Sequence, residues 1–90
     1  MKVAVIGSGG REHAICVALK KSENLDKIFC IPGNAGTEMI ADNIDINIDH
    51  FEKIKEFVLT KKVDLVIVGP EKPLVEGIVD FLEDNNIPVF

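Results

Sequence analysis

A glycine-rich segment near the start of the chain carries the residue types best suited to binding a small anion. Gly7 ends an apolar run, Gly9 and Gly10 follow it, and Arg11 is the only arginine in the chain. Glycines let the backbone turn tightly and approach a ligand, and a helix that begins here presents N–H groups without partners. The guanidinium group of Arg11 can hold a phosphate or a carboxylate through two parallel hydrogen bonds. The segment therefore predicts an anion site, with a ligand-free tight turn and a surface ion pair of Arg11 as the alternatives.

Two further loops carry polar residues among glycines and prolines. The PGNAGT segment contains Gly33 and Asn34, and the amide of Asn34 could bind a sugar or an amino acid. In the GPEKPL segment, Glu71 follows Pro70, and a second proline nearby stiffens the chain further. A carboxylate held in this way can bind an amine or a pair of hydroxyl groups. Each loop also has a purely structural interpretation, a plain turn in the first case and an acid that stabilises a helix start in the second.

Glu12 bears on whether the glycine-rich segment binds a dinucleotide. A dinucleotide-binding turn follows the pattern G-x-G-x-x-G, and an acid about 20 residues further on binds the ribose. Gly7 and Gly9 fit this pattern, but Glu12 stands at the third glycine and Ile31 ends the second apolar run without an acid. A carboxylate at that third position disfavours a pyrophosphate. A nicotinamide- or flavin-binding domain of an oxidoreductase is therefore kept only as the alternative hypothesis.

Other functional classes lack the residues that they need. A response-regulator scaffold requires clustered acids after its first strand, where this chain has Gly7, Ser8 and Gly9. The chain also contains no Walker motif, no HExxH motif and no defensible Ser–His–Asp arrangement. Cys16 and Cys30 lie in apolar runs without metal-ligand spacing, so both are predicted to be reduced core residues. We therefore predict no catalytic and no metal-binding residues.

Short apolar runs that alternate with helical patterns must position these loops. Residues 2–6, 27–31 and 64–68 each contain four apolar residues in succession after one charged residue, which is typical of strands buried on both faces of a parallel sheet. Residues 44–48 alternate isoleucine with polar side chains and predict a half-exposed edge strand. Residues 87–90 predict a last strand.

Helices are predicted between these strands. The first spans residues 11–21, and residues 32–41 form a loop with room for one helical turn. Asp49 and Glu52 have the spacing of a capping box at the start of the next helix. Pro73 suits the first turn of the last helix. The apolar stripe expected on the first helix consists of Ala14, Ile15, Ala18 and Leu19.

The order of the elements predicts an α/β fold. Because crossovers between parallel strands are right-handed, the expected architecture is a three-layer, doubly wound (Rossmann-like) sheet with strand order 3-2-1-4-5. The chain reverses direction across the sheet between strands 1 and 4, and ligands bind at the carboxyl ends of the strands beside such a point. The glycine-rich and GPEKPL loops meet there.

Composition limits the class of protein further. Of the 90 residues, 47% are hydrophobic and 28% are charged. This composition predicts a single folded domain that spans residues 1–90. The net charge of −5 disfavours nucleic acid as a partner, because a polyphosphate requires a basic face. No apolar run approaches the roughly 20 residues of a membrane helix, so we expect no membrane partner and a cytoplasmic location.

Four segments together resemble a known family. VIGSGGREHA, PGNAGT, DLVIVGPEKPLVEGIVD and the closing residues 87–90 are similar, in this order and spacing, to the amino-terminal domain of the phosphoribosylamine–glycine ligases. The resemblance implies a domain that precedes an ATP-grasp domain in an ATP-dependent enzyme of purine biosynthesis, which joins 5-phosphoribosylamine to glycine.

The resemblance also implies how the functions are divided. ATP and Mg²⁺ (or Mn²⁺) are bound by the ATP-grasp part, which this chain lacks together with the carboxy-terminal domain. The partners of this domain are then 5-phosphoribosylamine, glycine and the remaining domains of the same enzyme, and the chain alone is not expected to catalyse. By similarity, the residues expected to approach phosphoribosylamine or glycine are Gly9, Gly10, Arg11, Glu12, Gly33, Asn34, Pro70 and Glu71.

Overall fold

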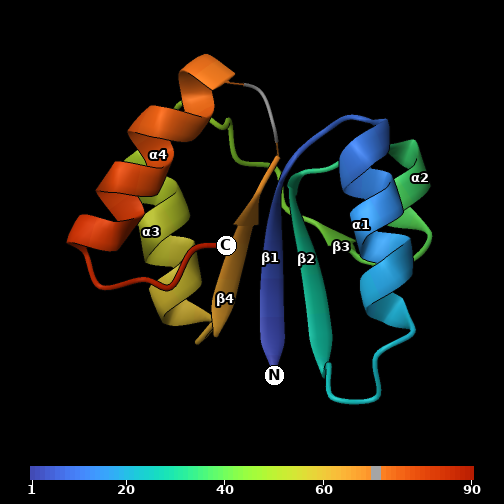
Figure 1. Ribbon diagram of the computed structural model, residues 1–90. Helices are drawn as coiled ribbons and strands as arrows, with labels where there is room; N and C mark the ends of the chain where they lie inside the picture. The colour runs from blue at the N-terminus through green and yellow to red at the C-terminus, as the bar shows by residue number, and fades with distance from the viewer. Residues whose placement is uncertain (70–71) are drawn as a thin grey trace.

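The computed structural model describes residues 1–69 and 72–90, which form an α/β fold with helices on both sides of one sheet (Figure 1). The strands are β1 (Lys2–Gly7), β2 (Lys27–Pro32), β3 (Asp42–Asn43) and β4 (Leu65–Val68). The helices are α1 (Gly10–Lys20), α2 (Ala35–Glu38), α3 (Phe51–Thr60) and α4 (Lys72–Asp84). The short α2 is the single helical turn that the sequence allows in its second loop.

The sheet is parallel, with strand order β3-β2-β1-β4. Val5 of β1 lies opposite Cys30 of β2 on one side and Ile67 of β4 on the other, so β1 is central. The predicted order of the first four strands is therefore confirmed. The last segment lies beside β4 as predicted, but it makes only a single bridge there, from Val89 to Val66.

Both faces of the sheet are buried, which explains why its strands are apolar at successive positions. One face packs against α3 and α4, and the other packs against α1 (Figure 1). On the first face, the rings of Phe29 and Phe57 meet edge to face with centroids 5.0 Å apart. On the second face, Cys16 of α1 and Cys30 of β2 are both fully buried and free, as predicted.

The predicted edge strand over residues 44–48 is wrong in its position. The strand is β3, at Asp42–Asn43, and pairing with β2 ends after the Ile44 N–H donates to the Cys30 carbonyl oxygen at 2.8 Å. The Ile46 N–H then bonds back to the Ile44 carbonyl oxygen at 2.8 Å, and such a tight turn leaves the ladder. Ile44, Ile46 and other alternating isoleucines still pack against the α3–α4 face. The alternation of isoleucine with polar residues therefore indicates which side chains are buried, but it does not indicate that the segment pairs with a strand.

The predicted capping box of α3 is also wrong. The helix starts at Phe51, and the preceding His50 makes no side-chain cap. The Asp49 N–H bonds to the Asn47 Oδ1 at 2.9 Å, while Glu52 pairs with Lys55 at 3.0 Å. A local asparagine turn thus competes successfully with the capping box, as short polar side chains commonly do.

The buried side of α1 differs in part from the predicted stripe. Ile15 and Leu19 pack against the sheet, but Ala14 and Ala18 are exposed. The fully buried position on this helix is Cys16, which lies against Cys30 of β2. The side facing the sheet is therefore rotated towards the cysteine.

Candidate functional site

The carboxyl ends of β1, β2 and β4 are joined by backbone hydrogen bonds. The Gly33 N–H, just after β2, donates to the Gly7 carbonyl oxygen at 3.1 Å. The Gly69 N–H, just after β4, donates to the Ile6 carbonyl oxygen at 2.9 Å. The glycine loop, defined as residues 7–10, therefore lies between the other two loops at the predicted switch point.

Glu12 lies beneath the glycine loop and is only 4% exposed. Its Oε1 accepts a hydrogen bond from the Gly9 N–H at 3.2 Å. A Cβ atom added to Gly7, where φ is +142°, would be 2.1 Å from this Oε1, and one added to Gly69 would be 2.9 Å from it. The carboxylate therefore fills the crevice between the ends of β1 and β4, and glycine at these positions makes room for it.

Among the residues that the structure describes, no side chain caps the first turn of α1, which lies at the same rim. Gly9 occupies the N-cap position and has no side chain that could bond to the first N–H groups of the helix. A Cβ atom added to Gly10 would meet nothing within 4 Å, and the side chain of Arg11 is exposed. Open N–H groups, the positive end of the helix dipole and an exposed guanidinium group together favour a phosphate or carboxylate.

Asn34 connects the second loop to the glycine loop. Its Nδ2 donates to the carbonyl oxygens of Ser8 at 2.9 Å and Gly9 at 3.2 Å. Its Oδ1 accepts a hydrogen bond from the Thr37 N–H at 2.9 Å and so caps α2. One side chain thus links the loops that follow β1 and β2.

A compact polar network supports Asn34 from below. Thr37 is fully buried, and its Oγ1 accepts from the Asn34 N–H at 2.8 Å and lies 2.7 Å from the Asn43 Oδ1. The Asn43 Nδ2 donates to the Asn34 carbonyl oxygen at 2.8 Å. Gly33, with φ +78°, is required here because an added Cβ atom would be 2.1 Å from the Asn43 Oδ1. Sequence reasoning missed Asn43, and no local pattern marks it, because it acts on a loop nine residues away.

The sequence matches one family model along its whole length. That model is described as the phosphoribosylglycinamide synthetase N domain, and the match covers residues 1–90. The chain belongs to this family.

Relatives of the synthetase N domain agree with the family model. The chain is 52% identical over 90 residues to a phosphoribosylamine–glycine ligase from Caldanaerobacter subterraneus, covering 100% of this chain and 22% of the relative. It is 44% identical over 92 residues to the ligase of the same name from Nostoc, again covering 100% of this chain and 22% of the relative. The chain thus spans about a fifth of the length of these curated relatives.

Solved structures show the same architecture. The crystal structure of phosphoribosylamine–glycine ligase from Thermotoga maritima matches with a TM-score of 0.57 and 29% identity, covering 80% of this chain and 16% of that one. A saccharopine dehydrogenase from Saccharomyces cerevisiae matches with a TM-score of 0.76 but only 13% identity, covering 98% of this chain and 20% of that one. At that identity the likeness concerns the fold alone.

The alternative of a dinucleotide-binding domain is not favoured. The matching relatives are ligases, Glu12 stands where the dinucleotide pattern requires its third glycine, and β2 ends at Pro32 without the acid that would bind a ribose. The synthetase N domain therefore shares the sheet of the dehydrogenase but differs from the dinucleotide pattern at the phosphate-binding turn.

The structure brings six of the eight predicted site residues to one rim of the synthetase N domain. Pro70 and Glu71 lie outside the described residues, so their predicted contacts stay predictions. The six residues at the rim are Gly9, Gly10, Arg11, Glu12, Gly33 and Asn34.

The buried cysteines below this rim are structural. Their Sγ atoms lie 2.9 Å apart. The hydrogen bond to Cys30, together with burial, raises the pKa of the Cys16 thiol far above its ordinary value, so this thiol stays protonated.

Over residues 1–69 and 72–90, no group of three His, Cys, Asp or Glu side chains could hold a metal ion. None of the described helices is both long enough and apolar enough to cross a bilayer.

Proposed function

We propose that residues 1–90 form the amino-terminal substrate-binding domain of an ATP-dependent ligase that joins 5-phosphoribosylamine to glycine in purine biosynthesis. The observation that carries the proposal is the full-length match to the synthetase N domain family, together with an open helix start at the switch point of the sheet. In this proposal the protein is cytoplasmic, and the partners of the domain are the two small substrates and the rest of the same enzyme.

The glycine loop and the first turn of α1 are the proposed phosphate site. Gly9 and Gly10 keep side chains away from the helix start, and the exposed Arg11 supplies a cation beside it. A sugar phosphate gains both from the helix dipole and from a bidentate guanidinium contact. Glu12, which is only 4% exposed, supports this turn from below through the hydrogen bond that its carboxylate accepts from the Gly9 N–H.

The two neighbouring loops are proposed to hold the rest of the substrates. Gly33 and Asn34 border the glycine loop on the β2 side. Pro70 and Glu71 come shortly after β4 in the sequence. The Glu71 carboxylate is suited to binding an amine. The sugar amine would then face the carboxyl carbon of glycine, which it attacks once ATP has activated it as an acyl phosphate, with phosphate as the leaving group.

The whole ligase is proposed to hold ATP and Mg²⁺ or Mn²⁺ outside this chain, in an ATP-grasp domain. Relatives that are several times longer leave room for such a domain, since the chain covers 22% of their length. ATP supplies the activation of the glycine carboxylate as an acyl phosphate. The share of residues 1–90 is to bind and orient the sugar.

The first test is the Arg11→Ala variant of the whole ligase. We expect the KM for 5-phosphoribosylamine to rise about tenfold or more, because a charge-assisted contact to phosphate contributes on the order of 1.5–3 kcal/mol. The KM for ATP should change much less, and steady-state kinetics with each substrate varied in turn measures both. Lys21→Ala is the matched control, because it removes an exposed positive charge at the other end of the same helix. Equal effects of Arg11→Ala on both KM values would mean that Arg11 is structural.

A second measurement tests the division of labour between domains. Residues 1–90 alone, mixed with ATP, glycine and 5-phosphoribosylamine, should give no turnover above background. Turnover by this chain alone would overturn the proposed domain assignment.

A further inference from the structure

The polar atoms of the Asn34 side chain are bonded to other groups of the protein. Both of its donor contacts go to the glycine loop, at the Ser8 and Gly9 carbonyl oxygens, and its acceptor caps α2 through Thr37. We propose that Asn34 is a positioning residue: it fastens the glycine loop to the loop between β2 and α2 (residues 33–34, the β2 loop) and so presets the first turn of α1 for the sugar phosphate. This inference rests on the proposed function and reassigns Asn34 from a substrate contact to a residue that acts through Gly9.

Gly9 is held on both of its peptide groups. Its N–H donates to the Glu12 Oε1 at 3.2 Å, from below the loop. Its carbonyl oxygen accepts from the Asn34 Nδ2 at 3.2 Å and from the His13 N–H at 3.2 Å. Because the peptide planes on either side of Gly9 are fixed, the N–H groups that follow at the helix start already point in one direction. A ligand that binds there loses less free energy to ordering the loop.

The link between the two loops depends on the NH₂ group of the Asn34 side-chain amide. Both Asn34 donor contacts end on carbonyl oxygens, so the side chain must offer hydrogens there. An aspartate could still accept the Thr37 N–H and cap α2, since Asp is as good an N-cap residue as Asn. It would lose both donors and bring a negative oxygen against the carbonyl oxygens of Ser8 and Gly9. Asn34→Asp therefore breaks the link between the loops while keeping the cap.

The surroundings of Asn34 are closely packed. Its hydrogen bonds to the glycine loop therefore join two parts of the chain whose helices, α1 and α2, already touch. A Cβ atom added to Gly36 of α2 would lie 3.2 Å from the His13 Nε2 of α1 and 3.2 Å from the Asn34 Oδ1. The Asn34 backbone is itself anchored through Thr37 and Asn43. The amide therefore transmits the position of the β2 loop to the glycine loop.

The test compares Asn34→Asp with Asn85→Asp in the whole ligase. Asn85 is a matched control because its Nδ2 also donates to a backbone carbonyl, that of Phe81 at 2.8 Å, at the far end of α4. For Asn34→Asp we expect the KM for 5-phosphoribosylamine to rise about tenfold, since two net hydrogen bonds are lost, while the KM values for ATP and glycine stay within about twofold. Asn85→Asp should leave all three KM values within about twofold of the wild type.

Hydrogen exchange in the ligand-free ligase separates positioning from direct contact. The His13 N–H, bonded to the Gly9 carbonyl oxygen, reports on the loop. We expect Asn34→Asp to speed exchange in the peptide that contains His13 about tenfold, and Asn85→Asp to leave it unchanged. If Asn34 instead touched the substrate directly, the KM would rise while exchange in the free enzyme stayed the same, which would overturn the positioning role.

The remaining outcomes are also decisive. A selective effect of Arg11→Ala with no effect of Asn34→Asp would reject the positioning role and leave the proposed phosphate site standing. Wild-type kinetics in both variants would reject the site itself. If Asn34→Asp fails to fold, Asn34→Ser keeps a capping oxygen without the added charge and should raise the same KM by a smaller factor.

Discussion

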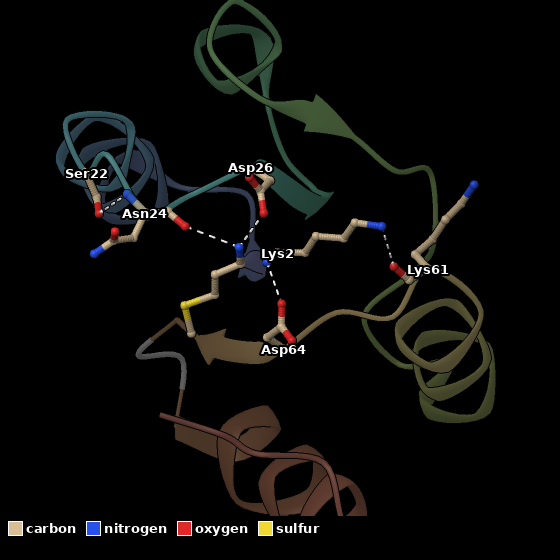
Figure 2. Close-up of polar contacts among 7 residues, drawn as sticks. Lys2, Ser22, Asn24, Asp26, Lys61 and Asp64 are labelled. Atoms are coloured by element: carbon tan, nitrogen blue, oxygen red, sulfur yellow. Dashed lines mark hydrogen bonds and ion pairs between the residues drawn. The ribbon is translucent and has the colours of Figure 1, made fainter.

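The two ends of the sheet use their polar groups in different ways. At the amino ends of the strands, charges are paired with one another or with the backbone (Figure 2). The Met1 amine lies 2.5 Å from the Asp26 Oδ2, and the Lys2 N–H donates to the Asp64 Oδ2 at 2.7 Å. The Lys2 Nζ donates to the Lys61 carbonyl oxygen at 3.1 Å. All of these contacts are exposed, so solvent screens them and each contributes little to stability.

At the carboxyl ends, the loops are tied together by neutral groups. Backbone amides, Asn34 and a buried threonine make most of the contacts, and the buried carboxylate of Glu12 accepts a hydrogen bond from the Gly9 N–H. The exposed Arg11 then stands beside a helix start with open N–H groups. One end of the sheet thus pairs charged groups with one another and with the backbone, whereas the other holds an exposed cation beside the start of a helix.

The largest expected effect on stability is at Gly7. The Gly7→Ala change places a Cβ atom 2.1 Å from the Glu12 Oε1 at a φ of +142°, so we expect a loss of about 3 kcal/mol or more in the free energy of unfolding. Urea denaturation measures the loss. Gly10→Ala is the matched control: its Cβ atom meets nothing within 4 Å, so it should be neutral or stabilising by up to about 1 kcal/mol. Similar costs at both glycines would contradict the packing of Glu12 against the glycine loop.

An intermediate effect is expected at Thr37. Thr37→Val keeps the shape of the side chain but leaves the Asn34 N–H without its acceptor in a buried network, which should cost about 1–3 kcal/mol. Thr37→Ser retains the hydroxyl group and loses one buried methyl group, at a cost of about 0.8 kcal/mol. Thermal and urea denaturation of the two variants should therefore rank valine as the worse substitution. The reverse order would mean that packing, and not the hydroxyl group, holds this loop.

The smallest effect is expected at the amino end of the sheet, for Asp26→Asn. The hydrogen bond and the charge of the Met1 amine lower the pKa of the Asp26 carboxyl below its ordinary value. A lowered pKa contributes stability that is present above the ordinary value of 3.8 and is lost as the pH falls through the lowered one. Any difference between wild type and Asp26→Asn in melting temperature should thus appear at neutral pH and vanish in acid. A difference larger than that of Thr37→Val would overturn the contrast between the two ends.

The strands and the switch point could be predicted from sequence because their signals are local. In residues 2–6, 27–31 and 64–68, one charged residue is followed by four apolar residues in succession, and the structure places three strands there in the predicted order. The edge strand failed because alternating isoleucines indicate a buried side but not a ladder partner. The α3 cap failed because the turn at Asn47 competes for the same backbone segment.

Composition and motifs by themselves determined an α/β domain, its central strands, the glycine-rich turn after β1 and the family to which the turn points. Only the tertiary structure decided how the rim is held together. Glu12 is buried because Gly7 and Gly69, from two different strands, leave a space for its carboxylate. Asn34 reaches Ser8, 26 residues away, because parallel pairing of β1 and β2 brings their ends together. Contacts of this kind depend on the distance between loops in space, which no spacing along the chain records.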